Sequence, residues 1–196
     1  LGAAAIRTGQ RVTGVDASRG DGVTLEVTDQ DTGSVTSQAA DVVIAADGIR
    51  SSVRNSLYGT AIPLASNGWV MYRGATRAAP FLSGGSMVII GDETQRVVVY
   101  PIAEGSSPAS RLTNWAVLVK VGEGNAPPPR REDWSRPGRR EELMPHVARF
   151  SVPHVAVPNL IAATSEFYEY PCCDRDPLPY WSSGRVTLLG EAAPPM

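Results

Sequence analysis

Two short segments of this 196-residue chain place glycine and polar side chains directly after an apolar run. In the first, Asp47 and Gly48 follow residues 41–46, and Ser51 and Arg54 come next. Glycine lets a ligand approach the backbone, a helix N-terminus attracts phosphate, and an arginine adds a full positive charge. The alternative is a plain strand-to-helix turn with Ser51 as the helix cap, because such turns commonly use these residue types. Both interpretations stay open on local grounds.

The second segment is Gly190, Glu191 and Ala192, which follows the apolar run 185–189. Small residues at a helix start permit close approach by a cofactor, and the carboxylate can accept hydrogen bonds from ribose or ribityl hydroxyls. The alternative is an acidic residue that is stabilised by the dipole at a helix N-terminus. Here too, local chemistry leaves both open.

Strands and a helix must position these residues. The runs 41–48 and 185–190 show no polar alternation, which predicts strands of a parallel sheet that are buried on both faces. Residues 51–57 predict a short helix capped by Ser51 or Ser52. Near the start of the chain, β-rich residues flank an Asp-Gly turn at 21–22, which predicts a hairpin.

The middle of the chain has a different texture. Four β-rich stretches separated by turns predict an antiparallel sheet, at residues 68–76, 86–92, 95–102 and 113–121. A proline-rich connector and helical segments follow before a strand at 167–170. The order is therefore α/β, then mainly antiparallel β, then α/β again.

Composition restricts the ligand classes. The chain has 18 basic and 20 acidic residues, a net charge of −2 that argues against nucleic-acid and anionic-membrane partners and favours a small molecule. No run approaches the roughly 18 apolar residues that span a bilayer. The only cysteines, Cys172 and Cys173, are adjacent, and poor disulfide geometry predicts reduced thiols in a cytoplasmic protein.

Together, the two strand-end segments resemble motifs of the FAD-dependent aromatic hydroxylases of the para-hydroxybenzoate hydroxylase and salicylate hydroxylase type. DVVIAADGIRSSVR at 41–54 is similar to the family's DG motif, and GRVTLLGEAAPPM at 184–196 to its GD motif. The connecting pieces at 72–74, 100–101 and 174–179 also have counterparts there. The resemblance implies a partial FAD-binding Rossmann-like domain with an inserted, mainly antiparallel substrate domain. The expected boundaries are 1–62 and 166–196 for the first and 63–165 for the second.

The resemblance also implies roles. Asp47, Gly48, Ser51 and Arg54 would serve FAD and NAD(P)H, and Gly190, Glu191 and Ala192 would approach the ribityl and pyrophosphate groups of FAD. The antiparallel lobe, residues 67–121, would roof the substrate pocket, with Tyr72, Arg73 and Tyr100 as candidate contacts to an aromatic substrate. On local chemistry Arg73 fits either a substrate carboxylate or a solvated or cross-strand-paired position, and the second is the more frequent outcome. In the family, NAD(P)H reduces the flavin and an oxygen atom from O₂ is delivered to an electron-rich ring.

Three departures from the family pattern support a second hypothesis. Glu191 stands where the family has Asp, Pro194 stands where it has His, and no GxGxxG fingerprint occurs. We expect that the missing βαβ unit precedes Leu1 and that the segment along the flavin ring follows Met196. The alternative is a truncated relative without flavin chemistry, acting as a small-molecule binding module or a cofactor-free cyclase or isomerase.

The remaining candidates are weaker. His146 and His154 lack the spacing and the carboxylate cluster of a metal site, so ordinary surface or helix-end histidines are favoured. Trp69 and Trp115, like Tyr72 and Tyr100, fit either sheet core or the wall of an aromatic pocket. The sequence assigns no catalytic side chain, no metal ligand and no oligomeric state.

Overall fold

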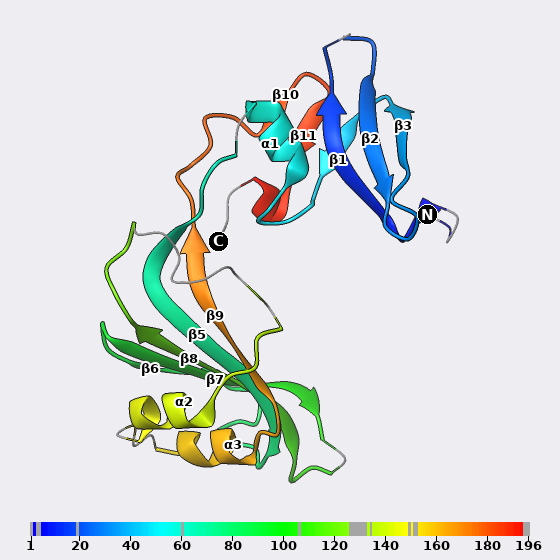
Figure 1. Ribbon diagram of the computed structural model, residues 1–196. Coiled ribbons are helices and arrows are strands. Elements are labelled where there is room, and N and C mark those ends of the chain that lie inside the picture. The colour runs from blue at the N-terminus through cyan, green and yellow to red at the C-terminus, as the bar shows by residue number, and fades with distance from the viewer. Residues whose placement is uncertain are drawn as a thin grey trace. The chain divides into compact units, whose positions relative to one another are not determined.

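The computed structural model describes residues 2, 5–18, 20–59, 61–105, 107–125, 133, 135–148, 150 and 153–193 (Figure 1). The chain divides into two compact units, which comprise Leu1–Leu64 with Asp174–Met196, and Ala65–Cys173. Both units combine helices with sheets, so the predicted α/β class is confirmed at that level. Within the described residues, no helix has both the length and the apolar character needed to cross a membrane.

A three-stranded antiparallel meander opens the first unit, made of β1 (Gln10–Asp16), β2 (Val23–Asp29) and β3 (Val35–Ala40). The predicted hairpin is confirmed, because Gln10 pairs with Asp29 and Asp16 with Thr24. At the β2–β3 turn, one carboxylate oxygen of Asp29 accepts hydrogen bonds from Asp31 and Thr32. This turn fixes the register of the meander.

A second small sheet carries the two predicted strand ends. Its order is β10 (Ser182–Ser183), β11 (Val186–Leu188) and β4 (Val43–Ala45), with β11 parallel to β4. Helix α1 (Ser52–Tyr58) follows β4, and a 3₁₀ helix (Gly190–Ala192) follows β11. Alternate strand residues join side chains of α1 and the 3₁₀ helix in one core: Val43, Ala45, Val53, Val186, Leu188 and Ala192.

The burial of β4 differs from the prediction. The apolar run predicted a strand covered on both faces, but the side chain of Ile44 is 64% exposed between two buried neighbours. Side chains alternate across a strand, and only one face of this sheet is packed by the described residues. Among them, β4 therefore behaves as a one-sided strand.

The second unit contains a five-stranded sheet in the order β6-β7-β8-β5-β9. Its strands are β5 (Ala65–Ala78), β6 (Val88–Gly91), β7 (Gln95–Glu104), β8 (Arg111–Lys120) and β9 (Phe167–Asp174). The ladders from β6 to β7, β7 to β8 and β8 to β5 are antiparallel, which confirms the predicted sheet.

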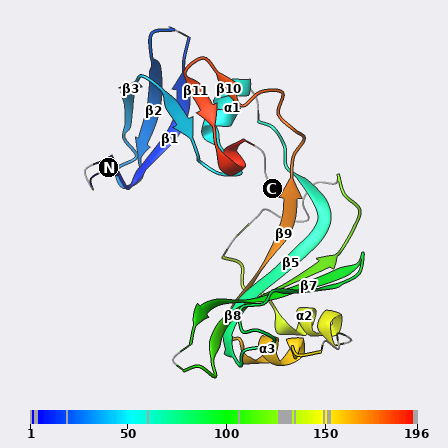
Figure 2. The same cartoon turned by 180° about the vertical axis from the view of Figure 1, so that it is seen from behind.

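Two helices, α2 (Arg140–Val147) and α3 (Val157–Ala163), cover one face of this sheet (Figures 1 and 2). Trp115 on β8 is fully buried there, and its indole N–H donates to Thr164 Oγ1 at 2.8 Å. The hydroxyl of Thr164 in turn donates to the carbonyl of Leu160 in α3 at 2.7 Å. This relay ties the central strand to the helical layer. Residues 126–132 and 134 of the predicted proline-rich connector, Pro127 among them, lie outside the described residues.

The second boundary between the units lies later than the sequence placed it. The expected return to the first unit was at residue 166, but the second unit extends to Cys173. The reason is that β9 forms hydrogen bonds beside β5 and completes the five-stranded sheet. A short β-rich stretch looks the same in either unit, because its pairing partner is not encoded locally.

Candidate functional site

Parallel pairing brings the two strand-end motifs to one edge of the small sheet. Ala45 pairs with Leu188, and the backbone N–H of Leu189 donates to the carbonyl of Ala45 at 2.8 Å. Asp47 and Gly190 therefore each lie two residues beyond the same rung of the ladder. In open α/β sheets this carboxyl edge is where ligands bind.

The loop after β4 is built around the start of α1. Asp47 Oδ2 accepts from the backbone N–H groups of Ser52 and Val53 at 2.8 and 3.3 Å. Ser51 is the N-cap residue, and its Oγ accepts from the N–H of Arg54 at 2.9 Å. The predicted helix and cap are thus confirmed. Asp47 stays exposed, so its carboxylate can still accept a hydrogen bond from a ligand, whereas Ser51 is fully buried.

The resemblance implied that Arg54 would serve FAD and NAD(P)H, and the structure places its guanidinium in a buried position. Its side chain is 1% exposed, and the guanidinium donates to three backbone carbonyls. Nη2 donates to Ile49 at 2.7 Å, and Nη1 donates to Ala192 at 3.0 Å and to Glu191 at 3.4 Å. Burial lowers the pKa of this guanidinium, and the charge of Asp47 opposes that change. Arg54 therefore links the two motifs from the buried side, through hydrogen bonds to their backbone carbonyls.

The turn after β11 places the three predicted cofactor residues, Gly190, Glu191 and Ala192, in different surroundings. Gly190 has a φ of +60° and Glu191 is exposed, whereas Ala192 is fully buried in the core of the unit. The small side chain of Ala192 therefore serves packing, and its carbonyl holds Arg54. Pro194, which departs from the family pattern, lies outside the described residues.

Both turns leave room for a cofactor. Gly48 has a φ of +78° and Gly190 a φ of +60°, and a Cβ at either position would meet no heavy atom within 4 Å. The two backbones are thus open to close approach at the same sheet edge, with the carboxylates of Asp47 and Glu191 beside them. Open glycine backbone next to hydroxyl-accepting carboxylates fits the ribityl and phosphate portion of a flavin.

The predicted substrate residues fall on opposite faces of the large sheet. Tyr72 is buried in the core beneath α2 and α3, so the expectation that it faces a substrate is replaced by a packing role. Alternation along the strands places Arg73 and Tyr100 on the other face. The same alternation resolves the tryptophans: Trp115 is core, and Trp69 lies on the face of Arg73, with Arg96 stacked 5.2 Å from its ring.

Asn114 on β8 is a member of this second face that the sequence analysis missed. Its Oδ1 accepts from Arg73 Nε at 2.9 Å, and it pairs across the ladder with Tyr100. Asn114 is 3% exposed, and its Nδ2 has no hydrogen-bond partner among the described residues. An asparagine within a predicted strand was the available signal, since such a residue is uncommon in strands.

Arg175 is a second residue without a predicted role. It follows β9 directly and is 8% exposed. Its Nη1 donates to the carbonyl of Ile62 at 3.0 Å, and its Nη2 donates to the carbonyl of Ile49. Nothing in the local sequence distinguishes this buried arginine from a solvated one in a turn.

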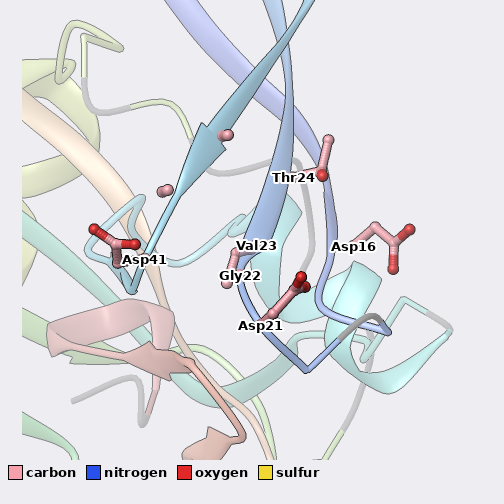
Figure 3. A pocket seen from close by; sticks show the side chains of 8 residues that line it. Asp16, Asp21, Gly22, Val23, Thr24 and Asp41 are labelled. Atoms are coloured by element: carbon pink, nitrogen blue, oxygen red, sulfur yellow. The ribbon is translucent and has the colours of Figure 1, made fainter.

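A separate hollow of about 360 Å³ lies at the meander of the first unit (Figure 3). Asp16, Asp21 and Asp41 line it, so its charge disfavours a phosphate-bearing ligand. No group of three or more His, Cys, Asp or Glu side chains in the described part of the chain is arranged to hold a metal ion. His146 forms a hydrogen bond with Gln95 at 3.1 Å.

Comparisons with known proteins agree with this geometry. The FAD binding domain family matches residues 1–195. The chain is 34% identical over 196 residues to phenazine 1,6-dicarboxylic acid hydroxylase PhzS of Lysobacter antibioticus, covering 98% of the chain and 47% of that relative. It is 32% identical to 6-hydroxynicotinate 3-monooxygenase of Bordetella bronchiseptica, covering all of the chain and 47% of the relative.

Solved structures give the same result. A salicylate hydroxylase substrate complex superposes with a TM-score of 0.68 at 27% identity, over 95% of this chain and 46% of that one. Klebsiella pneumoniae HpxO complexed with FAD and uric acid gives 0.68 at 25% identity, over 98% and 45%. The chain spans about half the length of these relatives. It belongs to the FAD binding domain family, and its relatives include hydroxylases and a monooxygenase, while one of the two solved structures holds FAD.

Proposed function

We propose that this chain is part of an FAD-dependent monooxygenase that hydroxylates an aromatic small molecule with NAD(P)H and O₂. The observation that carries the proposal is the parallel register of β4 and β11, which places the turns at Gly48 and Gly190 at one sheet edge. The match of the FAD binding domain family to residues 1–195 supports it. A Rossmann-like arrangement of the first unit is part of the same proposal.

The cofactor residues divide into two groups. Gly48 and Gly190 would admit the ribityl and pyrophosphate groups to the backbone, and Asp47 and Glu191 would accept hydrogen bonds from hydroxyls. Ser51, Arg54 and Ala192 would support these residues without contacting the cofactor. Ser51 caps α1, and Arg54 holds the two turns together through the carbonyls of Ile49 and Ala192. The bound flavin, reduced by the nicotinamide, supplies the oxygen-transfer chemistry, while these side chains orient it.

The substrate residues lie on the sheet face that α2 and α3 leave uncovered. Arg73 is held at Nε by Asn114, and among the described residues neither terminal nitrogen of its guanidinium forms a hydrogen bond, so both can bind a ligand. Tyr100 and Trp69 supply aromatic surface on the same face. We therefore propose an aromatic substrate with an anionic group, such as a carboxylate, and assign Tyr72 a supporting role in the core.

Net charge and the cysteines bear on the class of ligand and on the cellular location of the protein. A net charge of −2 supports a small-molecule substrate and gives no basis for a nucleic-acid or membrane partner. Cys172 and Cys173 form no disulfide, which supports a cytoplasmic location.

Flavin binding is the direct test. We expect the intact protein to acquire a visible flavin spectrum on mixing with FAD, and to consume NAD(P)H faster when an electron-rich aromatic acid is added. Glu191→Gln should weaken FAD binding several-fold because the amide is a poorer acceptor for hydroxyls, while the exposed Glu93→Gln in the other unit serves as the matched control. An intact protein that stays colourless and consumes no NAD(P)H would refute the proposal and favour a relative without flavin chemistry.

A further inference from the structure

Two buried arginines share one backbone carbonyl oxygen in the first unit. Arg54 and Arg175 lie 121 positions apart, yet both donate through Nη2 to the carbonyl of Ile49. Ile49 directly follows Gly48, whose backbone is one of the two open turns. A carbonyl oxygen has two lone pairs, so it can accept from both guanidinium groups at once.

Each arginine uses its other terminal nitrogen to reach a different segment. Arg54 Nη1 donates to the carbonyls of Glu191 and Ala192, in the second open turn. Arg175 Nη1 donates to the carbonyl of Ile62 at 3.0 Å. The result is a chain of hydrogen bonds that runs from the Gly190 turn through Arg54, Ile49 and Arg175 to Ile62.

This series of hydrogen bonds ends where the polypeptide leaves and re-enters the first unit. Ile62 lies three residues before β5 begins, and Arg175 comes directly after β9 ends. These two crossover segments are residues 61–64 and 174–177. Arg175 therefore ties the outgoing and returning segments to each other and to the loop after β4.

Structural stability alone is a weak reason for this arrangement. Two guanidinium groups of like charge are buried near each other, and replacing buried charge by packed apolar groups is often neutral or stabilising. Arginine remains protonated in proteins, so the forks stay charged and can hold several carbonyls in a fixed geometry. Fixing the relative position of several backbone segments is what such a fork does well.

We propose that Arg175 is a positioning residue that couples the crossover segments to both cofactor-side turns, through the Ile49 carbonyl and Arg54. Order at the crossover and order at the turns are then linked, and the linkage is reciprocal. Loosening Arg54 increases backbone opening at residues 61–64, and loosening Arg175 increases it at residues 190–192. The extension to a bound flavin rests on the proposed function, whereas the coupling between segments does not.

The first arm of the test uses hydrogen exchange of the intact protein without ligand. We expect Arg175→Gln to raise exchange at 190–192 at least about tenfold, as expected when the charge-assisted hydrogen bonds of Arg175 to Ile49 and Ile62 are lost. Arg54→Gln should do the same at 61–64. Arg175→Lys, which can hold one carbonyl more easily than two, should fall between wild type and Arg175→Gln.

Arg185→Gln is the matched control, because Arg185 also donates to two backbone carbonyls in this unit, those of Gly20 and Asp41. It should leave exchange at 61–64 and 190–192 unchanged. If Arg175→Gln unfolds the unit, Arg175→Lys carries the test. Effects confined to the segment each arginine touches, or effects equal to those of Arg185→Gln, would overturn the proposal.

The second arm adds FAD and follows protection at the crossover. In the wild type, FAD should slow exchange at 47–52, 190–192 and also 61–64; in Arg175→Gln it should still slow the first two but no longer the third. Failure of FAD to protect any segment of the wild type would count against the proposed function and leave the ligand-free arm to decide the coupling. Protection of the two turns without protection of 61–64 in the wild type would overturn the extension of the coupling to a bound flavin.

Discussion

Gly74 on β5 offers a sharp test of the packing in the second unit. A Cβ at this position would lie 2.7 Å from Trp115 Cζ2, 2.9 Å from Phe167 Cβ and 3.0 Å from Thr164 Cγ2. All three distances are far shorter than ordinary carbon contacts of roughly 3.5–4.0 Å. Phe167 Cβ cannot move without its backbone, so Gly74→Ala must displace a strand as well as side chains.

We expect Gly74→Ala to lower the free energy of unfolding of this unit by about 3 kcal/mol, at the upper end of typical overpacking costs. For a domain of this size that corresponds to a fall in Tm of roughly 10 °C or more. Urea unfolding followed by tryptophan fluorescence measures it directly, because Trp115 reports on the affected site.

Gly85→Ala is the matched control, since a Cβ there meets nothing within 4 Å and the residue has no positive φ. It should be neutral or slightly stabilising, because alanine restricts the unfolded chain. Combining Gly74→Ala with Trp115→Phe should cost about 1 kcal/mol less than the sum of the single changes, because phenylalanine lacks the Cζ2 atom. A Gly74→Ala variant as stable as the wild type would refute this account of the core.

Three further predictions concern the sites. Asp47→Ala should lower the free energy of unfolding by about 1 kcal/mol in urea titrations because the first two N–H groups of α1 lose their acceptor, whereas Asp47→Asn, which keeps an acceptor, should cost less. Burial raises the pKa of the Cys172 thiol from 9.0 to about 11, so stability should fall between pH 9 and pH 11 as the unfolded chain ionises first; thermal unfolding of Cys172→Ala should show a shallower fall over this range. Asn114→Ala should raise KM for an anionic substrate by roughly tenfold with little change in kcat, since Arg73 loses its positioning partner; equal effects on a neutral substrate would count against that role.

Local signals in the sequence were sufficient for the short-range elements. The capping serine predicted α1, the Asp-Gly turn predicted the first hairpin, and the β-rich stretches predicted the antiparallel strands. Each of these depends on residues close in the chain, where turn and cap chemistry act directly. The parallel pairing of β4 with β11 joins residues more than 140 positions apart, and only the two motifs taken together pointed to it.

Features that depend on three-dimensional partners were not predictable in the same way. The sequence could not tell which of the two neighbouring residues, Tyr72 or Arg73, faces the core, because strand register decides which face α2 and α3 cover. It also placed β9 in the wrong unit and expected both faces of β4 to be buried. In each case the missing information was the identity of the neighbouring element.

The charged residues of the strand-end motifs show the same distinction in chemical terms. Arg54 and Glu191 both follow apolar strands, and local chemistry left a structural and a ligand-facing role open for each, while the family resemblance implied contact with the cofactor. The side chain of Arg54 instead donates hydrogen bonds to three backbone carbonyls in a buried space. The guanidinium has only N–H donors, and carbonyl oxygens are the acceptors that the backbone supplies. Glu191 has no donors to offer those carbonyls and stays exposed beside the open Gly190 turn. The motif therefore separates a buried cation that shapes the backbone from an exposed anion that remains available to hydroxyl groups.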